Sequence, residues 1–342
     1  MIHHSKAPLR IGLAGGGTDV SPYSDLFGGA IINAAISLHA YATIEPINEN
    51  KIILNSIDQK EEQHFDWASE LPIDGKLNLL KGVYNRIQKD YALPIGGFKL
   101  STSVDAPVGS GLGTSSTLVV AILGAFKEML QLPLTQYEAA QYAYQIERND
   151  LQLAGGKQDQ YAATFGGVNF MEFYGNDKVI VNPLQIKAEC LLQLQNNLVL
   201  YFTNMSRESA AIINEQVNNV NTKNEKSINA MHQLKEQAKM MKEALLKGNV
   251  DKIGKILDYG FTQKRLMAHN ISNDRIETIY EAAKKAGATG GKISGAGGGG
   301  FMTFYCPNNS RDAVIKTLGD FGDGISKYAF VEHGLMTWSS ST

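Results

Sequence analysis

The sequence contains only two cysteines in 342 residues, and neither has the spacing of metal ligands or of a redox motif. Cys190 and Cys306 are each set among apolar residues, which favours two buried free thiols over one disulfide. Such cysteine usage is typical of a reducing compartment. The N-terminus also lacks a basic segment followed by an apolar one, so we expect a cytoplasmic protein.

Long apolar runs and an excess of charge of either sign are missing as well. No stretch approaches the roughly 18–20 apolar residues that span a bilayer. The formal net charge is −2, which does not provide the basic surface typical of proteins that bind nucleic acid or anionic membranes. Hydrophobic residues make up 43% of the chain, enough to bury a core. The composition therefore favours a globular protein, and it is compatible with a local basic pocket for a phosphorylated ligand. The sequence leaves a homodimer open.

The hydrophobic pattern predicts a mixture of strands and helices. Strands are expected at 7–14, 30–46, 51–67 (as a hairpin), 98–104, 166–173, 197–203, 301–306 and 326–333. Helices are expected at 76–91, 116–130, 135–150, 207–247, 251–268, 273–287 and 310–321, the third of them opening with a Thr135/Glu138 capping box. We place a domain boundary at residue 195, which gives predicted domains of 1–195 and 196–342.

The segment Pro107–Ser116, Pro-Val-Gly-Ser-Gly-Leu-Gly-Thr-Ser-Ser, directly precedes a long apolar helix. Alternating glycines let a backbone approach a ligand closely. The first N–H groups of a helix, with the positive end of its dipole, attract phosphate, and a hydroxyl there can ligate Mg²⁺. We therefore predict a polyphosphate-binding loop in preference to a turn that only caps a core helix.

Other known motifs do not fit this segment. A Walker A loop is excluded because no Gly-Lys-Ser/Thr follows the glycines, and the spacing is not the G-x-G-x-x-G of dinucleotide-binding folds. A nicotinamide-dependent oxidoreductase is therefore disfavoured. The chain also has no G-x-S-x-G elbow of a serine hydrolase.

Further glycines and two isolated carboxylates draw attention because of the predicted phosphate loop. Seven glycines lie between residues 290 and 300, which favours a loop that closely surrounds a ligand over an inert turn. Taken alone, Glu147 would be an ordinary helical surface residue, and Asp159 would be the N-cap of a short helix. Neither assignment excludes a catalytic role beside bound phosphates.

Three glycine-rich segments in this order resemble those of the GHMP kinase superfamily, and the resemblance covers essentially the whole chain. The first segment, residues 7–19, is Ala-Pro-Leu-Arg-Ile-Gly-Leu-Ala-Gly-Gly-Gly-Thr-Asp; the others are 107–116 and 292–300. Within the superfamily, the Ala-Gly-Gly-Gly-Thr-Asp form resembles that of sugar 1-kinases acting on D-glycero-D-manno-heptose 7-phosphate.

The resemblance implies an α+β, two-domain GHMP kinase fold. Its N-terminal domain would be ribosomal-protein-S5-domain-2-like with a left-handed βαβ element, its C-terminal domain would be ferredoxin-like, and the site would lie between them. The implied activity is ATP-dependent phosphorylation of the anomeric hydroxyl of a sugar or sugar phosphate, with Mg²⁺.

The resemblance also assigns roles residue by residue. Asp159 would act on the acceptor hydroxyl with Arg10 beside it, and Ser115 and Glu147 would hold Mg²⁺. The residues expected to bind ATP are Pro107, Gly109, Ser110, Gly111, Leu112, Gly113, Thr114 and Ser115. Those expected to bind the sugar substrate are Gly15, Gly16, Gly17, Thr18, Asp19, Lys157, Gly297 and Gly298.

One departure from the family bears on the acceptor. Galactokinases have Glu-His where this chain has Gly16-Gly17, and two glycines leave room and backbone N–H groups for a bulkier or phosphorylated sugar. The sequence does not identify the basic residues that would bind a distal phosphate. Galactose, fucose, a uronic acid or an isoprenoid alcohol such as mevalonate stay open as acceptors. A non-catalytic sugar- and ATP-binding sensor on the same fold is a further alternative.

Overall fold

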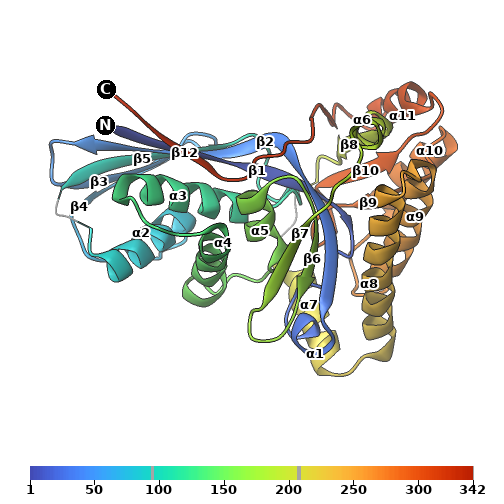
Figure 1. The fold of residues 1–342 in the computed structure, drawn as a ribbon, viewed down its shortest axis with the longest axis horizontal. Helices are drawn as coiled ribbons and strands as arrows, with labels where there is room; N and C mark the ends of the chain where they lie inside the picture. Colours follow the sequence, from blue (N-terminus) through green and yellow to red (C-terminus); the bar gives the residue numbers. More distant parts are fainter. Residues whose placement is uncertain (94–95, 206–208, 342) are drawn as a thin grey trace.

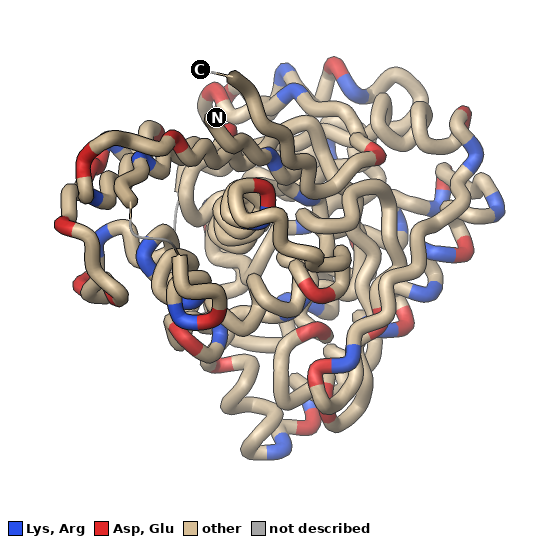
Figure 2. The backbone as a smooth tube through the Cα atoms, turned by 60° about the vertical axis from the view of Figure 1, so that its left-hand side comes forward, with Lys and Arg blue, Asp and Glu red and all other residues tan. Residues whose placement is uncertain are grey.

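The computed structural model describes residues 1–93, 96–205 and 209–341, which form two β-sheets with helices packed on them (Figure 1). Residues 207 and 208, where the predicted helical region 207–247 begins, lie outside the described residues. None of the helices in these ranges is long and apolar enough to cross a membrane. Lys and Arg positions are interspersed with Asp and Glu along the backbone (Figure 2), in keeping with the net charge of −2.

The larger sheet has eight strands in the order β12-β1-β2-β5-β3-β4, with β6 paired to β2 and β7 to β6. The long strand β2 pairs with β5 through its C-terminal half and with β6 through its N-terminal half. The strands of this larger sheet are β1 (Ile2–Ala14), β2 (Gly29–Ile47), β3 (Lys51–Ser56), β4 (Glu61–Asp66), β5 (Gly97–Val104), β6 (Val168–Phe173), β7 (Val179–Pro183) and β12 (Met336–Ser340).

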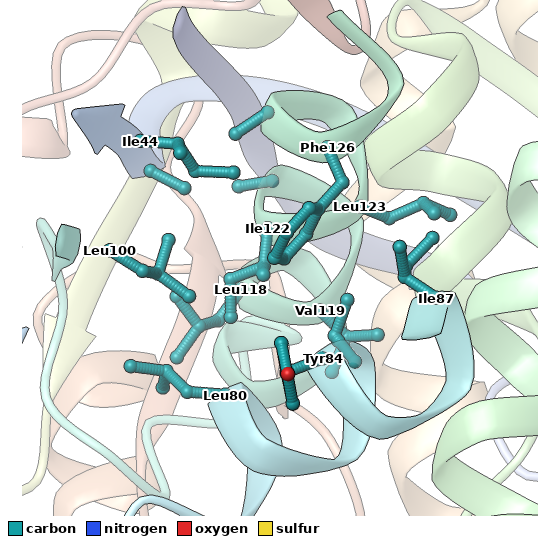
Figure 3. Close-up of a cluster of buried hydrophobic side chains, with 14 of the residues drawn as sticks. Ile44, Leu80, Tyr84, Ile87, Leu100, Leu118, Val119, Ile122, Leu123 and Phe126 are labelled. Carbon is teal, nitrogen blue, oxygen red and sulfur yellow. The ribbon is translucent and has the colours of Figure 1, made fainter. Parts of the chain in front are cut away.

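Helices α2 (Asn78–Tyr91), α3 (Thr114–Leu130), α4 (Gln136–Gln145) and α5 (Gln158–Phe165) cover one face of this sheet (Figure 1). Helix α3 is the central one, and Figure 3 shows its Ile122 and Phe126 between Tyr84 of α2 and the sheet residues Ile44 and Leu100. Burial of each large side chain contributes roughly 1.5–3 kcal/mol. This core fixes the position of α3 and therefore of the glycine loop at its N-terminus.

The smaller sheet has the order β11-β8-β10-β9, and all its pairs are antiparallel. Numbered along the chain its strands run 4-1-3-2, and helices separate the first from the second and the third from the fourth, as expected of a ferredoxin-like unit. The strands are β8 (Leu198–Phe202), β9 (Gly290–Ile293), β10 (Phe301–Tyr305) and β11 (Ile325–Ser326). The helices of this half are α6 (Ala188–Asn197), α7 (Ser209–Asn221), α8 (Glu225–Leu246), η2 (Val250–Lys252), α9 (Ile253–Lys264), α10 (Asp274–Lys285) and α11 (Arg311–Gly319).

The end of the chain differs from its prediction. The strand expected at 326–333 is wrong, because only 325–326 pair within the smaller sheet. The following residues cross to the larger sheet, where Val331 N donates to Ala35 O at 3.1 Å, and β12 then pairs with β1. The two termini consequently lie side by side (Figure 1). The predicted boundary at residue 195 falls inside α6, and β12, assigned to 196–342, lies in the larger sheet.

Candidate active site

The three glycine-rich segments meet in one cleft. The first segment contributes the end of β1 and the turn after it, the second contributes the N-terminus of α3, and the third contributes the turn between β9 and β10. Helices α7 and α9 of the C-terminal half complete the wall. The predicted site residues in the lining are Arg10, Gly17, Asp19, Gly109, Gly111, Gly113, Thr114, Ser115, Glu147 and Asp159.

The backbone of the second segment is oriented with its carbonyl groups held by the protein. Phe301 N donates to Ser110 O at 2.8 Å, and Arg10 N donates to Leu112 O at 3.1 Å. Arg10 Nη1 also donates to Gly111 O at 2.6 Å. In contrast, the N–H groups of Gly109, Gly111 and Gly113 meet no protein acceptor within the described part of the chain. Donors without acceptors at a helix N-terminus form a cradle for an anion such as phosphate.

Glycine is required here by the packing of one loop on another. Gly111 has φ +79°, and a Cβ on it would lie 2.8 Å from Ser294 O. A Cβ on Gly295 would likewise lie 2.8 Å from Gly111 Cα. The second and third segments therefore touch backbone to backbone, and any side chain at either position would separate them.

Arg10 and Asp159 form the central ion pair of the cleft. Arg10 Nη2 lies 2.6 Å from Asp159 Oδ1, and Nε donates to the same oxygen at 2.7 Å. The guanidinium is 3% exposed and the carboxylate 23%, so the carboxylate is the partner open to the cleft. Asp159 lies in the first turn of α5 and faces the second segment, since a Cβ on Gly113 would be 3.2 Å from its Cγ. The pair is thus fixed beside the predicted phosphate cradle.

Glu147 is a buried carboxylate on a π-helical turn, η1 (Ile146–Asp150). Ser116 Oγ donates to Glu147 Oε1 at 3.0 Å, and the Gln160 side-chain amide donates to Oε2. Burial raises the pKa of Glu147, with Arg148 Nη1, 3.6 Å from Oε1, acting in the opposite direction. The serine hydrogen-bonded to Glu147 is therefore Ser116, whereas Ser115, predicted as its partner at the metal, is exposed to the cleft.

Asp19 is the buried acid of the first segment, only 2% exposed. Its Oδ2 accepts a hydrogen bond from Gln158 N at 3.1 Å, which ties the first segment to the start of α5. Burial raises the pKa of Asp19, and the nearby Asp159 acts in the same direction. A Cβ on Gly156 would overlap the Asp19 carboxylate, so Gly156 allows this close contact.

Several predicted residues lie outside the lining. Lys157 Nζ is buried between Asp25, at 3.3 Å, and Asp177, at 3.0 Å, and does not face the cleft. Gly297 and Gly298 pack against Ile271. The other predicted residues that do not line the cleft belong to the same first and second segments as residues that do: Gly15, Gly16, Thr18, Pro107, Ser110 and Leu112.

Lys264 and Gln216 are among the polar lining residues that the sequence analysis did not identify, although the sequence contains a pattern that could have indicated each of them. Lys264 follows Ile253, Leu257 and Phe261 on the buried face of α9, where an apolar residue is expected. Gln216 lies between Ile212 and Val220 on the buried face of α7. A polar residue in an apolar stripe indicates either a buried hydrogen bond or a ligand contact.

The cleft fits Mg²⁺ that arrives with a nucleotide better than a metal held by protein alone. The described residues contain no group of three or more His, Cys, Asp or Glu side chains able to hold a metal ion. Mg²⁺ commonly binds through one or two carboxylates, water and the substrate's phosphates. Glu147, with the cleft-facing hydroxyl of Ser115, provides a donor set of that kind.

The fold and the cleft define a small-molecule kinase of the GHMP type, and the chain belongs to this family. The family model "GHMP kinases N terminal domain" matches residues 78–167, and "GHMP kinases C terminal" matches residues 241–324. The chain is 45% identical, over 98% of both chains, to the D-glycero-alpha-D-manno-heptose 7-phosphate kinase of Campylobacter jejuni.

Solved structures show the same fold. A D-glycero-D-manno-heptose 1-phosphate kinase from Bacteroides thetaiotaomicron matches with a TM-score of 0.85 and 44% identity, over 99% of this chain and 100% of that one. A Lactococcus lactis galactokinase matches with a TM-score of 0.77 over 98% of this chain and 95% of that one. At 21% identity, the galactokinase shows the fold alone. The expected two-domain GHMP kinase fold is confirmed.

The burial of Glu147 predicts a conflict between stability and function. Its folded-state pKa is raised, so the folded protein holds this proton more tightly than the unfolded chain, and stability falls as pH rises above the unfolded pKa. We expect Glu147→Gln to raise the Tm in Mg²⁺-free buffer by roughly 2–4 °C at neutral pH, with a smaller gain near pH 4. Glu281→Gln, at an exposed position on α10, is the control and should leave the Tm unchanged. A lower Tm for Glu147→Gln at neutral pH would show that the buried Glu147 carboxylate does not destabilise the folded protein.

Proposed function

We propose that this protein is an ATP-dependent sugar kinase that phosphorylates the anomeric hydroxyl of a sugar phosphate, with D-glycero-D-manno-heptose 7-phosphate as the best candidate. One observation carries the proposal: a cradle of free backbone N–H groups lies directly beside the Arg10–Asp159 pair. The C. jejuni relative, named for a heptose 7-phosphate, supports the choice of acceptor. A cytoplasmic location stays a prediction from the sequence.

The cradle is where we propose that the triphosphate of ATP binds. The N–H groups of Gly109, Gly111 and Gly113 and the dipole of α3 favour negative charge at this point. Ser115 and Glu147 would hold the Mg²⁺, which neutralises phosphate charge when it is bound. Positioning and electrostatic stabilisation supply most of the rate in such phosphoryl transfers.

Asp159 would then orient the acceptor hydroxyl and receive its proton. Its carboxylate faces the cleft, while the Arg10 guanidinium holds it from the buried side. Since an anomeric hydroxyl is more acidic than an ordinary alcohol, it demands less of its base. Arg10 contacts both Asp159 and Gly111 O, so it links the acceptor side of the cleft to the phosphate side.

The acceptor is tested by incubating the protein with Mg·ATP and a panel of sugars while ADP release is followed. The panel contains D-glycero-D-manno-heptose 7-phosphate, galactose, fucose, glucuronic acid and mevalonate. Turnover with the heptose phosphate, and a ³¹P NMR signal for a new phosphate on the anomeric oxygen, are expected. Faster turnover with any other member of the panel would overturn the heptose phosphate as the proposed acceptor. ATP binding without turnover of any sugar would favour a sensor.

Asp159→Asn keeps the size of the side chain and an oxygen that can accept from Arg10, but it removes the negative charge and with it the base. We expect turnover to fall at least ~10²-fold while Mg·ATP still binds. Turnover is measured by ADP release at saturating substrates, and ATP binding by calorimetry. Turnover near that of the wild type would remove Asp159 from the catalytic role.

Ser115→Ala and Ser116→Ala separate two hydroxyls that the structure distinguishes. If Ser115 ligates Mg²⁺, its loss should raise the Mg²⁺ concentration for half-maximal activity by about 10-fold, more than loss of Ser116, which would act only by orienting Glu147. An unchanged metal titration for Ser115→Ala, together with a shift for Ser116→Ala, would transfer the ligand role to Ser116.

A further inference from the structure

Lys264 is a buried cation in the cleft that the proposed mechanism does not use. It is the last residue of α9 and 3% exposed. Its Nζ donates to Gly295 O at 2.7 Å, and it forms no ion pair with any residue that the structure describes. A buried lysine with only a carbonyl partner is unusual, since buried charges are normally paired.

The other cations of the cleft already have acidic partners. Arg10 is paired with Asp159 at 2.6 Å, and Arg148 Nη1 lies 3.6 Å from Glu147 Oε1. Burial lowers the pKa of Lys264 to about 8, and among charged neighbours Asp19 raises it and Arg10 lowers it. Lys264 is therefore the cleft cation best able to gain from an incoming anion.

Gln216 supplies a second unsatisfied donor on the same wall. It is 2% exposed, and its Nε2 has no hydrogen-bond partner among the described residues. A Cβ on Gly17 would lie 3.6 Å from Gln216 Oε1, and a Cβ on Gly16 would lie 3.7 Å from Lys264 Nζ. The Gly16-Gly17 turn, Gln216 and Lys264 therefore converge on one place.

That turn adds backbone donors. The N–H groups of Gly16 and Gly17 have no acceptor within the described ranges, whereas Gly15 N is bound to Gln237 Oε1 at 3.1 Å. A Cβ on Gly17 would lie 2.5 Å from Met267 Cε, so glycine lets the Met267 side chain pack against this turn. One ammonium, one amide N–H₂ and two backbone N–H groups are thus gathered at one place, and donors of these kinds suit a phosphate group.

We propose that Lys264 and Gln216, together with the Gly16-Gly17 turn, bind the phosphate that the sugar substrate already carries. The inference rests on the proposed function and deepens it, because it names the residues that select a phosphorylated over an unphosphorylated sugar. The alternative anion is the γ-phosphate of ATP. Lys264 and Gln216 lie beside Gly16 and Gly17 of the first segment, which we predict binds the sugar, and this favours the sugar side of the cleft.

The test compares kcat/KM for D-glycero-D-manno-heptose 7-phosphate and for the same heptose without phosphate, in wild type and Lys264→Met. Loss of a charged hydrogen bond should lower kcat/KM for the phosphorylated heptose by roughly 10- to 100-fold, mainly through KM. The value for the unphosphorylated heptose should stay within about threefold of wild type. Lys264→Arg should restore most of the preference, and Gln216→Leu should reduce it to a smaller extent.

Lys292→Met is the matched control. Lys292 is also a buried lysine held by a backbone carbonyl, Gly12 O at 2.8 Å, but it does not line the cleft. Its loss should leave unchanged the ratio of kcat/KM for the phosphorylated heptose to kcat/KM for the unphosphorylated one. A parallel loss of kcat/KM for both heptoses in Lys264→Met, or an equal loss of preference in Lys292→Met, overturns the phosphate subsite alone. A wild type without preference for the phosphorylated heptose overturns the proposed acceptor as well.

Discussion

Two glycine loops from distant parts of the chain touch through their backbones, and the geometry of the cleft depends on that contact. Gly111 lies against Ser294 and Gly295 with no room for a Cβ, and Phe301 N holds Ser110 O. Carbonyl groups of the phosphate loop are held by Phe301 N and by Arg10, and the N–H groups of Gly109, Gly111 and Gly113 are left for a ligand. The same contact joins the larger sheet, with helix α3 packed on it, to the smaller sheet.

The electrostatics of the cleft follow from burial. Glu147 and Asp19 are held as acids in surroundings that raise their pKa values, and Lys264 as a base in surroundings that lower its pKa. For Glu147 and Lys264, the charged form is disfavoured until a ligand of opposite charge arrives. Strongly perturbed groups that share one cleft are typical of functional sites. We therefore expect bound Mg²⁺ to stabilise the charged form of Glu147, and the substrate phosphate to stabilise the charged form of Lys264.

Much of this could be predicted from the sequence because local chemistry determines it. The glycine spacing before an apolar helix indicated the phosphate loop, and Thr135 with Glu138 indicated a cap that the structure contains. Long-range pairing could not be predicted. The sequence of β12 does not reveal that β1 is its partner. Lys157 is neutralised by Asp25 and Asp177, and neither acid is adjacent to it in the chain.

The most direct test of the central claim is calorimetric titration of Mg·ATP into the wild type and into Gly111→Ala. We expect heat of binding for the wild type and an affinity at least ~10-fold weaker for the variant, since a Cβ there forces the two loops apart. Circular dichroism of the variant checks that the fold is retained. No binding by the wild type, or equal affinity in both proteins, would contradict it.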